Sequence, residues 1–550
     1  MINSLTTNKD PDCKSPLNKA TWRPDWEREA RVPSFITTTS IPGRGPYFLT
    51  PFGGQKYFWG NMPALNVLNL QENEGLEARD WRILFAASGD CRNVFKTIAC
   101  LPASYNGTFE LVMNDRDVEI VARNSLLVMT AFWFSPADAA QMMLHLWYSA
   151  FLPASMLDTL KETLSPMIQD VCAKIASRSL ATLQRKTWSN GSRSLCLALR
   201  KAAWNNLLSF LNVPDSLTVA AARDLRTAVT LAEERKDYLD RAIFRQPPAK
   251  RVAMMRFRED GLLLPFGSPR AAYDTPNPTF FHKNSPWPMK DSADPLEGWP
   301  SCEISDRATH ASEDVYGHLN TYLYRTFLQF CQTCDGLKIT IRLFQEDLVD
   351  LPQVLRQGGQ SEGGFDRIEV FGTVIPLRHD VTNCFEVSNT VDKGYVGTAG
   401  VLASLGPLLR LPSENQHACL IGLYLNATHD VSTAADELAP LMANSSRMRR
   451  YISINQAAVA SADKYNADLL NFSDAKSMFK DFDGLFKRYV HKERFEDICK
   501  VTGLLLKAKN TVIEPWPLRL PAEATQKEFD DLHQSAHDGG EHYVEWKRAV

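Results

Sequence analysis

Two short turns carry the residues of this chain whose types and spacing suit ligand chemistry. Ser88, Gly89 and Asp90 follow the apolar run ILFAA and precede a helix-like stretch. Further along, the run FELVM ends in Asn114 and Asp115. A glycine turn lets a ligand approach the backbone, a helix N-terminus offers N–H groups, and an acid after the second strand binds ribose hydroxyls in many nucleotide sites. The two turns therefore predict a nucleotide-type site.

The spacing of the glycines narrows the class of ligand. The chain has neither Gly-x-Gly-x-x-Gly nor Gly-x-x-x-x-Gly-Lys-Ser/Thr, which disfavours dinucleotide and nucleoside-triphosphate sites. What remains fits the looser pattern of S-adenosylmethionine sites. A purely structural alternative stays open, in which Gly89 only makes the turn, Asp90 caps the helix, and Asp115 pairs with Arg92 or Arg116.

The stretches around these turns predict a parallel sheet flanked by helices. Continuous apolar runs indicate buried strands, and helical periodicity separates them. A further short amphipathic helix is expected after Tyr57. The expected strands are 81–88, 109–115, 337–347, 365–371 and 417–427, and the expected helices include 93–101, 118–134 and 316–331.

The alternation of these elements predicts an α/β fold, with a doubly wound sheet interrupted by a helical insertion. Residues 136–260 show helical periodicity and few strand signals, and the last thirty residues resemble a frayed tail. The expected organisation is a flexible arm over 1–45, the two halves of the core over 46–135 and 313–433, a helical insertion with loops over 136–312, and a helical C-terminal segment with a tail over 434–550.

Composition limits the classes of function and location. The net charge of −3, from 61 basic and 64 acidic residues, gives no broad field for a nucleic acid. No apolar run reaches the roughly 20 residues of a membrane-spanning helix, and the polar N-terminus does not read as a secretory signal. The 11 scattered cysteines suit reduced thiols. We therefore expect a cytoplasmic protein whose partner is a small molecule or another protein, not a membrane.

Two other groups of residues have alternative interpretations. Cys331 and Cys334 form one Cys-x-x-Cys pair without a second pair at zinc-site spacing, so we read them as ordinary thiols and expect no metal. Ser88 lies at a strand-to-helix corner that suits acyl transfer, but no Gly-x-Ser-x-Gly elbow is present. The aromatic residues Trp59, Trp133, Trp147 and Tyr148 are read as core.

Five segments, YFWGNMPALNVLNL, ILFAASGDCRNVFKTIACLP, FELVMNDRDVEIVARNSLLV, VYGHLNTYLYRTFLQFC and NTVIEPWPLRL, together resemble a family of fungal proteins built around a domain of unknown function. That domain is similar to the N-terminal domain of dynein axonemal assembly factor 3. Some members carry a MYND zinc finger, whose cysteine array this chain lacks. The resemblance covers most of residues 20–520 and implies a Rossmann-like, methyltransferase-like core. It implies that one rim of the sheet carries Ser88, Gly89, Asp90, Arg92, Asn93, Asp115, Arg123 and Asn124.

An extra segment is expected within the second half of the core. Deleting residues 370–386 leaves FDRIEVSNTVDKGYVG, a strand followed by a polar turn, as the family pattern reads. The segment is either a retained intron or a genuine insertion that bulges beside the site. In both cases the turn that begins at Ser388 and Asn389 is expected to face the same rim as Gly89.

Three functions follow from these observations. The leading hypothesis is a methyltransferase-like core that either binds an S-adenosylmethionine-type ligand and acts as a group-transfer enzyme, or retains only the shape of such a site. Its expected ligand-binding residues are Ser88, Gly89, Asp90, Arg92, Asp115 and Asn389. The second hypothesis is a non-catalytic assembly or interaction factor, as the resemblance to the dynein factor implies. The third is an acyl-transfer enzyme that uses Ser88, as in cyclodipeptide synthases.

Overall fold

A nine-stranded sheet forms the centre of the protein in a computed structural model. The structure describes residues 14–36, 52–77, 79–283, 285–305, 311–357, 363–374, 388–393, 396–453, 465–513, 519–535, 537 and 539–549. The order of the strands across the sheet is β12-β13-β11-β8-β1-β2-β7-β5-β4. Their bounds are β1 Trp81–Ala87, β2 Thr108–Asn114, β4 Leu183–Asn190, β5 Arg193–Arg200, β7 Lys338–Phe344, β8 Arg367–Val370, β11 Cys419–Tyr424, β12 Leu504–Leu506 and β13 His542–Arg548.

The sheet is mostly parallel. β11, β8, β1, β2, β7 and β5 pair in parallel with their neighbours, whereas β4, β13 and β12 pair antiparallel. From β1 the chain adds β2 and then β7 on one side, and it later adds β8 and β11 on the other. The order therefore reverses between β1 and β8, and the carboxyl ends of these strands meet at one edge of the sheet. Two short pairs lie outside it, β3 (Phe151–Leu152) with β6 (Thr275–Pro276), and β9 (Thr373–Val374) with β10 (Ser388–Asn389).

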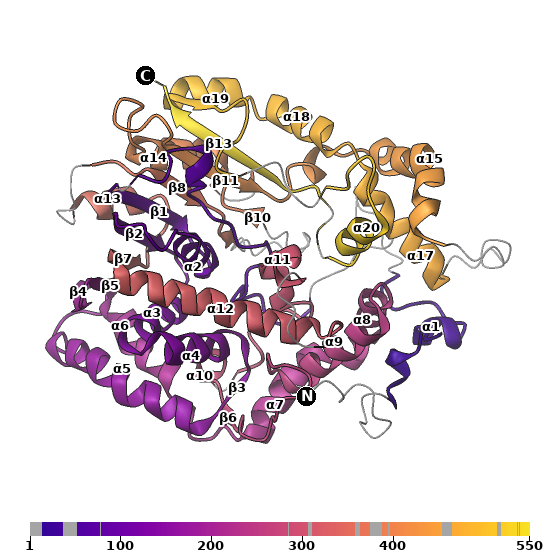
Figure 1. The fold of residues 1–550 in the computed structure, drawn as a ribbon, viewed down its shortest axis with the longest axis horizontal. Coiled ribbons are helices and arrows are strands. Elements are labelled where there is room, and N and C mark those ends of the chain that lie inside the picture. The colour runs from indigo at the N-terminus through magenta and orange to yellow at the C-terminus, as the bar shows by residue number, and fades with distance from the viewer. Residues whose placement is uncertain are drawn as a thin grey trace.

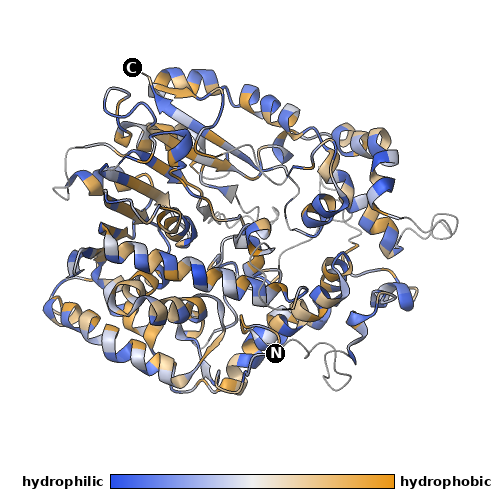
Figure 2. Ribbon diagram, in the orientation of Figure 1, coloured by the Kyte–Doolittle hydropathy of each residue, from blue (hydrophilic) through white to orange (hydrophobic). Residues whose placement is uncertain are grey.

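Both faces of the sheet are covered, as a parallel sheet requires. Strand β1 is buried throughout, and its residues alternate between two cores. Trp81, Ile83 and Phe85 join the core with helices α2, α3, α4 and α12, while Leu84 and Ala86 join the core with α13, α14, α18 and α19. Figure 2 shows the central strands coloured mostly hydrophobic and the outer helices mixed.

In the view of Figure 1, many of the helices form a broad layer below the sheet. The helices of the C-terminal segment form an arc beside the strands β11 and β13 (Figure 1). Their bounds are α1 Asp25–Arg28, α2 Arg92–Ala99, α3 Val118–Trp133, α4 Pro136–Tyr148, α5 Ala154–Lys174, α6 Lys201–Leu207, α7 Val219–Thr230, α8 Lys236–Phe244, α9 Pro248–Asp260, α10 Pro278–Phe281, α11 Ser301–Ser305, α12 Val315–Gly336, α13 Leu351–Gln357, α14 Gly397–Leu405, α15 Ala434–Tyr451, α17 Ala467–Asp474, α18 Phe482–Lys492, α19 Phe495–Thr502 and α20 Gln526–His533. Among the described residues, no helix has both the length and the apolar character needed to cross a bilayer.

Strands β4 and β5 lie within the region expected to be helical. They form an antiparallel hairpin, and β5 pairs with β7 at the edge of the sheet. Asn190 pairs with Arg193, so the two turn residues are Gly191 and Ser192. Gly191 has φ +60°, and a two-residue Gly-Ser loop between two strand-like runs is a hairpin signal in a sequence. The expectation of few strands in residues 136–260 overlooked this turn.

The C-terminal segment also contributes to the sheet. Strand β13 lies between β11 and β12, and Trp546 on it is fully buried. The expectation of a frayed tail is therefore wrong for residues 542–548. The charged residues of β13 misled the sequence reading, because the carboxylate of Glu545 is buried and accepts hydrogen bonds from the backbone N–H groups of Val512 and Ile513.

Residues 58–69 do not form the expected helix. Several of their backbone N–H groups donate instead to groups elsewhere, two of them to side chains of α2. Leu65 N donates to the amide oxygen of Asn93, and Val67 N donates to the hydroxyl of Thr97. Because these donors are satisfied outside a helix, residues 58–69 run across the end of the sheet with an irregular backbone. The stretch that overlaps with their beginning, residues 52–63, is called the covering segment below.

Two further expectations concern chain segments that are described only in part. Within the expected N-terminal arm, residues 14–36 include α1, and Trp26 and Phe35 are buried. Residues 375–387, most of the expected extra segment, lie outside the described residues, so its origin stays a prediction. The described ends of that segment, β9 and β10, pair antiparallel.

Candidate functional site

The turn after β1 has the left-handed backbone that favours glycine. Gly89 has φ +54°, and a Cβ atom there would meet nothing within 4 Å. The backbone conformation, not a lack of space, therefore calls for glycine. The adjoining Ser88 donates its N–H to the carbonyl of Asn114 at 2.8 Å, which joins the ends of β1 and β2. The open space in front of Gly89 is where a ligand can approach the backbone.

Asp115 lies directly against this turn. Its Oδ2 accepts a hydrogen bond from the N–H of Gly89 at 3.1 Å, and its Oδ1 accepts one from the N–H of Asp117 at 2.8 Å. Burial raises the pKa of Asp115 to about 7, against the effect of these two N–H donors, which lower it. The two turns singled out in the sequence thus meet at one point. Each carboxylate oxygen keeps a second lone pair for a ligand hydroxyl.

Asp90 and Arg92 hold the covering segment in place. Asp90 Oδ1 accepts from the backbone N–H of Arg92 at 3.1 Å and from its Nε at 2.7 Å, and Asp90 Oδ2 accepts from the N–H of Gly60 at 2.8 Å. The guanidinium of Arg92 also donates to the carbonyl of Met62. Asp90 therefore binds the first backbone N–H of α2, but the N-cap residue is Cys91 and not Asp90, to which the structural alternative gave this role. Arg92 pairs with Asp90, and no described ion pair joins it to Asp115.

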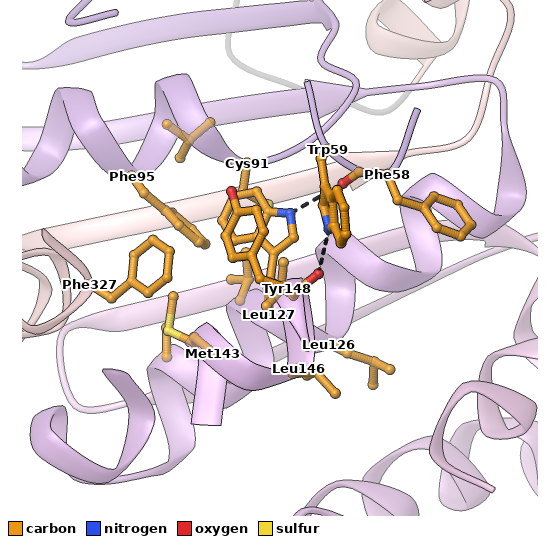
Figure 3. Close-up of a cluster of buried hydrophobic side chains, with 14 of the residues drawn as sticks. Phe58, Trp59, Cys91, Phe95, Leu126, Leu127, Met143, Leu146, Tyr148 and Phe327 are labelled. Carbon is orange, nitrogen blue, oxygen red and sulfur yellow. Dashed lines mark hydrogen bonds between the residues drawn. The ribbon is translucent and has the colours of Figure 1, made fainter. Parts of the chain in front are cut away.

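A buried aromatic cluster anchors the covering segment from below (Figure 3). Trp59 donates from Nε1 to the carbonyl of Trp147 at 2.8 Å, and Trp147 donates from Nε1 to the carbonyl of Phe58 at 3.2 Å. Tyr148 packs against both tryptophan rings. The reading of these aromatics as core therefore agrees with their contacts, while Trp133 is only half-buried.

A cavity of about 190 Å³ opens beside Asp115. One wall is the covering segment, and the others are the carboxyl ends of β1, β2 and β7 and the chain that follows β8. Its lining is mixed, with apolar surface from Ala86, Ile120 and Leu348 and polar surface from eight residues, which are Gln55, Lys56, Asn114, Asp115, Arg116, Asp117, Glu346 and Thr390. Small-molecule sites combine apolar surface with convergent polar groups, and this cavity is on the polar side of that range.

A second, smaller hollow adjoins the cavity on the other side of Gly89. Its volume is about 40 Å³, and it lies between the turn after β1, the end of β8 and β13. Both spaces are lined by Tyr57, Ile120 and Gly372, so they are neighbouring parts of one site. The smaller hollow is lined by Gly60, Asn61, Met62, Pro63, Ser88, Gly89, Asp90, Arg92, Asn93, Glu369, Phe371, Leu423 and Tyr543 in addition.

Two residues of the implied rim support the site from behind. The guanidinium of Arg123 donates to the carbonyl of Trp147 at 2.9 Å and lies between the rings of Phe58 and Phe280. Burial lowers its pKa to about 9. Asn124 donates from Nδ2 to the carbonyl of Gly89 at 2.7 Å and thereby fixes the turn. Neither residue lines the two spaces.

Asn389 is near the site, but its side chain faces away from it. Nδ2 donates to the carbonyl of Leu423 on β11 at 3.0 Å, and Asn389 is not among the residues that line either space. Its neighbour Thr390 lines the cavity instead. The turn was placed at the correct rim, but the facing residue was misassigned, because the side chain of Asn389 is needed to tie the turn to β11.

The surroundings of Ser88 do not favour acyl transfer. Ser88 Oγ makes a 3.5 Å contact to the carbonyl of Gly89, and none of the described residues lining its hollow is a histidine. Cys331 and Cys334 are buried on α12, and burial raises the pKa of both thiols. Within the described ranges, no group of three or more His, Cys, Asp or Glu side chains is arranged to hold a metal ion.

Sequence reasoning missed several lining residues. Tyr57, Glu346 and Tyr543 come from three separate parts of the chain, and only the fold brings them together. Glu346 lay inside the predicted strand 337–347, whereas in the structure it follows β7, which ends at Phe344, much as Asp115 follows β2. Glu369 had no usable signal, since a glutamate inside a short apolar strand reads as an exposed position.

Comparison with known proteins places a family match on this site. Residues 58–152 match the family model of a domain of unknown function (DUF4470). No curated protein and no solved structure matches the chain. The matched span begins in the covering segment and contains β1, α2, β2, α3 and α4, so it holds both Gly89 and Asp115.

Proposed function

We propose that this protein binds an S-adenosylmethionine-type ligand at the carboxyl edge of its sheet and acts in group transfer. The observation that carries the proposal is the meeting of the Gly89 turn and the Asp115 carboxylate beside a cavity, at the point where the strand order reverses. Ligands of open α/β sheets bind at such a reversal.

The topology of the sheet supports a Rossmann-like core of the methyltransferase-like kind. Without β4 and β5, the strands of the sheet in chain order are β1, β2, β7, β8, β11, β12 and β13, which we number one to seven. Read across the sheet from β7, their order is 3-2-1-4-5-7-6. The first five strands follow the Rossmann order. The seventh, β13, is antiparallel and lies between the fifth and sixth, β11 and β12. A reversed last strand in this place distinguishes the methyltransferase-like variant of the fold.

The types and the positions of the residues around the two spaces fit such a ligand. The cavity beside Asp115 has apolar surface for a base and a carboxylate for ribose hydroxyls, and the smaller hollow beside Gly89 suits the amino-acid arm. The cavity volume of about 190 Å³ is below the roughly 300–1,000 Å³ of drug-sized pockets. The covering segment must therefore move outward when a whole ligand enters.

Several residues of the chain would contribute to binding, each in a different way. Asp115 accepts hydroxyl hydrogen bonds, Gly89 lets the ligand approach the backbone, and Tyr57 and Lys56 on the covering segment exclude water from above. Lys56 pairs with Asp117 and Glu119 at the start of α3, and these contacts hold the segment closed. S-adenosylmethionine, when bound, would supply a methyl group carried on a sulfonium sulfur.

A thermal-shift titration tests the proposal. S-adenosylmethionine and S-adenosylhomocysteine should raise the melting temperature of the full chain, because each binds only the folded state. Asp115→Ala should remove the shift. Asp481→Ala is the matched control, since Asp481 also accepts a backbone N–H, that of Gly484 at the start of α18, yet lies outside the site. No shift of the wild-type protein with saturating ligand would contradict the proposal.

One observation favours an interaction factor as the second candidate. The two most exposed large apolar side chains among the described residues lie on C-terminal helices, Met442 on α15 at 83% and Val501 on α19 at 87%. Such side chains can contact a partner. If this second candidate is correct, Met442→Lys and Val501→Lys should remove co-purifying partners that Asp115→Ala retains.

A further inference from the structure

Two buried charged residues share one face of strand β8. Arg367 is fully buried and has a complete set of partners. Its guanidinium donates to both carboxyl oxygens of Glu74, at 2.9 and 2.6 Å, and to the backbone carbonyls of Val67, Leu68, Asp366 and His417. Arg367 thus shows how this fold satisfies a buried charge when that charge has a structural role.

Glu369, two residues further along the same strand, has no such partners. Its side chain lies on the same face, and Glu369 is 1% exposed. Neither carboxyl oxygen makes a hydrogen bond of good geometry among the described residues, and the one polar side chain that interacts with the carboxyl as a hydrogen-bond donor is the amide of Asn93. An unsatisfied buried carboxyl is costly, and in a native protein it calls for an explanation such as a missing ligand group.

The position of Glu369 points to a ligand. It lines the smaller hollow at the carboxyl end of β8. The pairing of β1 with β8 shifts its register beside it, because Phe85 pairs with Glu369 whereas Ala87 pairs with Val370. Such bulges are frequent next to active sites, where they re-aim a side chain.

The size and charge of the hollow limit what it accepts. A water-sized group needs about 10–15 Å³ of such volume, so about 40 Å³ admits a small polar group and excludes a ring. The charged side chains around it are Glu369, Asp90 and Arg92. Asp90 and Arg92 already pair with each other, which leaves the carboxyl of Glu369 to set the local preference. That preference is for a cation or a hydrogen-bond donor.

We infer that Glu369 receives a primary ammonium group of the ligand in the hollow between the Gly89 turn and the end of β8. The inference rests on the proposed function, since an adenosyl ligand with an amino-acid arm would place its nucleoside beside Asp115 and its α-ammonium in the adjoining hollow. It names the part of the ligand that β8 recognises.

Binding of the ammonium changes the protonation state of Glu369. Burial raises the pKa of Glu369 to about 8, with Asp90 raising it further and Arg92 and Asn93 lowering it. The carboxyl is therefore mostly protonated at pH 7. When the ammonium binds, the carboxyl loses its proton to solvent and becomes the carboxylate partner of the ammonium. Binding of an ammonium-bearing ligand at pH 7 should release close to one proton through Glu369.

Calorimetry with two nucleosides tests the inference on the full chain. S-adenosylhomocysteine carries the α-ammonium, and 5′-deoxy-5′-methylthioadenosine lacks the amino-acid arm. Wild-type protein should bind the first about tenfold or more tightly, the effect of one hydrogen-bonded charge. Titrations in two buffers of different ionisation enthalpy should show the additional proton release with the first ligand only. Glu369→Gln should abolish both differences and leave the affinity for methylthioadenosine unchanged.

The outcomes separate the inference from the proposed function. If wild-type protein binds both nucleosides equally, or if Glu369→Gln keeps the preference and the proton release, the inference is wrong and the proposed function stands. If neither nucleoside binds the wild-type protein, both are wrong. The comparison within the wild-type protein does not depend on the variant. Glu369→Gln is checked for folding by circular dichroism.

Discussion

Replacing Glu369 by glutamine should stabilise the protein, and the gain should grow with pH. The perturbation removes an ionisable group and keeps the volume of the side chain. In the folded protein the pKa of Glu369 is raised to about 8, whereas the ordinary glutamate pKa of the unfolded chain is 4.5. Between these two values the folded state holds a proton that the unfolded state has lost. The free energy of unfolding of the wild-type protein therefore falls as the pH rises through this interval.

The size of the effect follows from that difference. Each pH unit between the two pKa values costs the wild-type protein about 1.4 kcal/mol. From pH 6 to pH 8 the gain of Glu369→Gln over wild type should increase by about 2–3 kcal/mol and then level off above pH 8. For a chain of 550 residues that melts as one unit, this corresponds to about 2 °C in melting temperature. Asp90 and Arg92 face Glu369 but remain paired in both proteins.

The assay is calorimetric melting at pH 6, 7 and 8, with a matched glutamate as control. Glu545 on β13 is as buried as Glu369, but its carboxylate accepts from the N–H groups of Val512 and Ile513 and pairs with Lys507. Glu545→Gln should lower the melting temperature at every pH, because it leaves Lys507 without its charge partner. If Glu369→Gln behaves like Glu545→Gln, or if its gain does not grow with pH, the carboxyl of Glu369 has a structural partner and the reasoning is refuted.

Three further predictions concern the site and its support. Gly89→Ala and Gly503→Ala should each lower the melting temperature by about 1 °C, since both glycines have positive φ with open space around them. Only Gly89→Ala should weaken the binding of S-adenosylhomocysteine in calorimetry. Equal binding by both variants would mean that no ligand approaches the turn. Glu74→Ala should lower the free energy of unfolding, measured with denaturant, by about 3–5 kcal/mol, because it leaves Arg367 buried without a charge partner. Adding Arg367→Met to the Glu74→Ala protein should recover most of that loss. A much smaller loss in Glu74→Ala alone would contradict the packing described for β8. The affinity for 5′-deoxy-5′-methylthioadenosine should fall as the pH drops below about 7, where Asp115 becomes protonated. Asp115→Asn should flatten this pH dependence. An unchanged pH profile in the variant would exclude Asp115 as the acceptor of the ribose hydroxyls.

The strands that position the site were predictable because their signals are local. β1 and β2 are continuous apolar runs that end in turn residues, and both lie where the sequence predicts them. The adjacency of Gly89 and Asp115 then follows from parallel pairing alone, since the carboxyl ends of neighbouring parallel strands meet at one edge.

Residues 58–69 and the outer strands were harder to predict, for a tertiary reason. Residues 58–69 have helical spacing of apolar side chains, but α2 supplies acceptors for some of their N–H groups, those of Leu65 and Val67, and this competition is not visible in the sequence. β13 carries charged residues that only their buried partners explain. The missing partners of Glu369 are a property of the whole fold, so no pattern within FDRIEV indicates them.

A crystal structure of the full chain with S-adenosylhomocysteine tests the central claim most directly. The account predicts that the ribose hydroxyls lie within hydrogen-bond distance of the Asp115 carboxylate, with the chain of the ligand passing Gly89 and the covering segment displaced outward. A ligand bound elsewhere, or a refined site in which apolar side chains fill the space between Gly89 and Asp115, would contradict it.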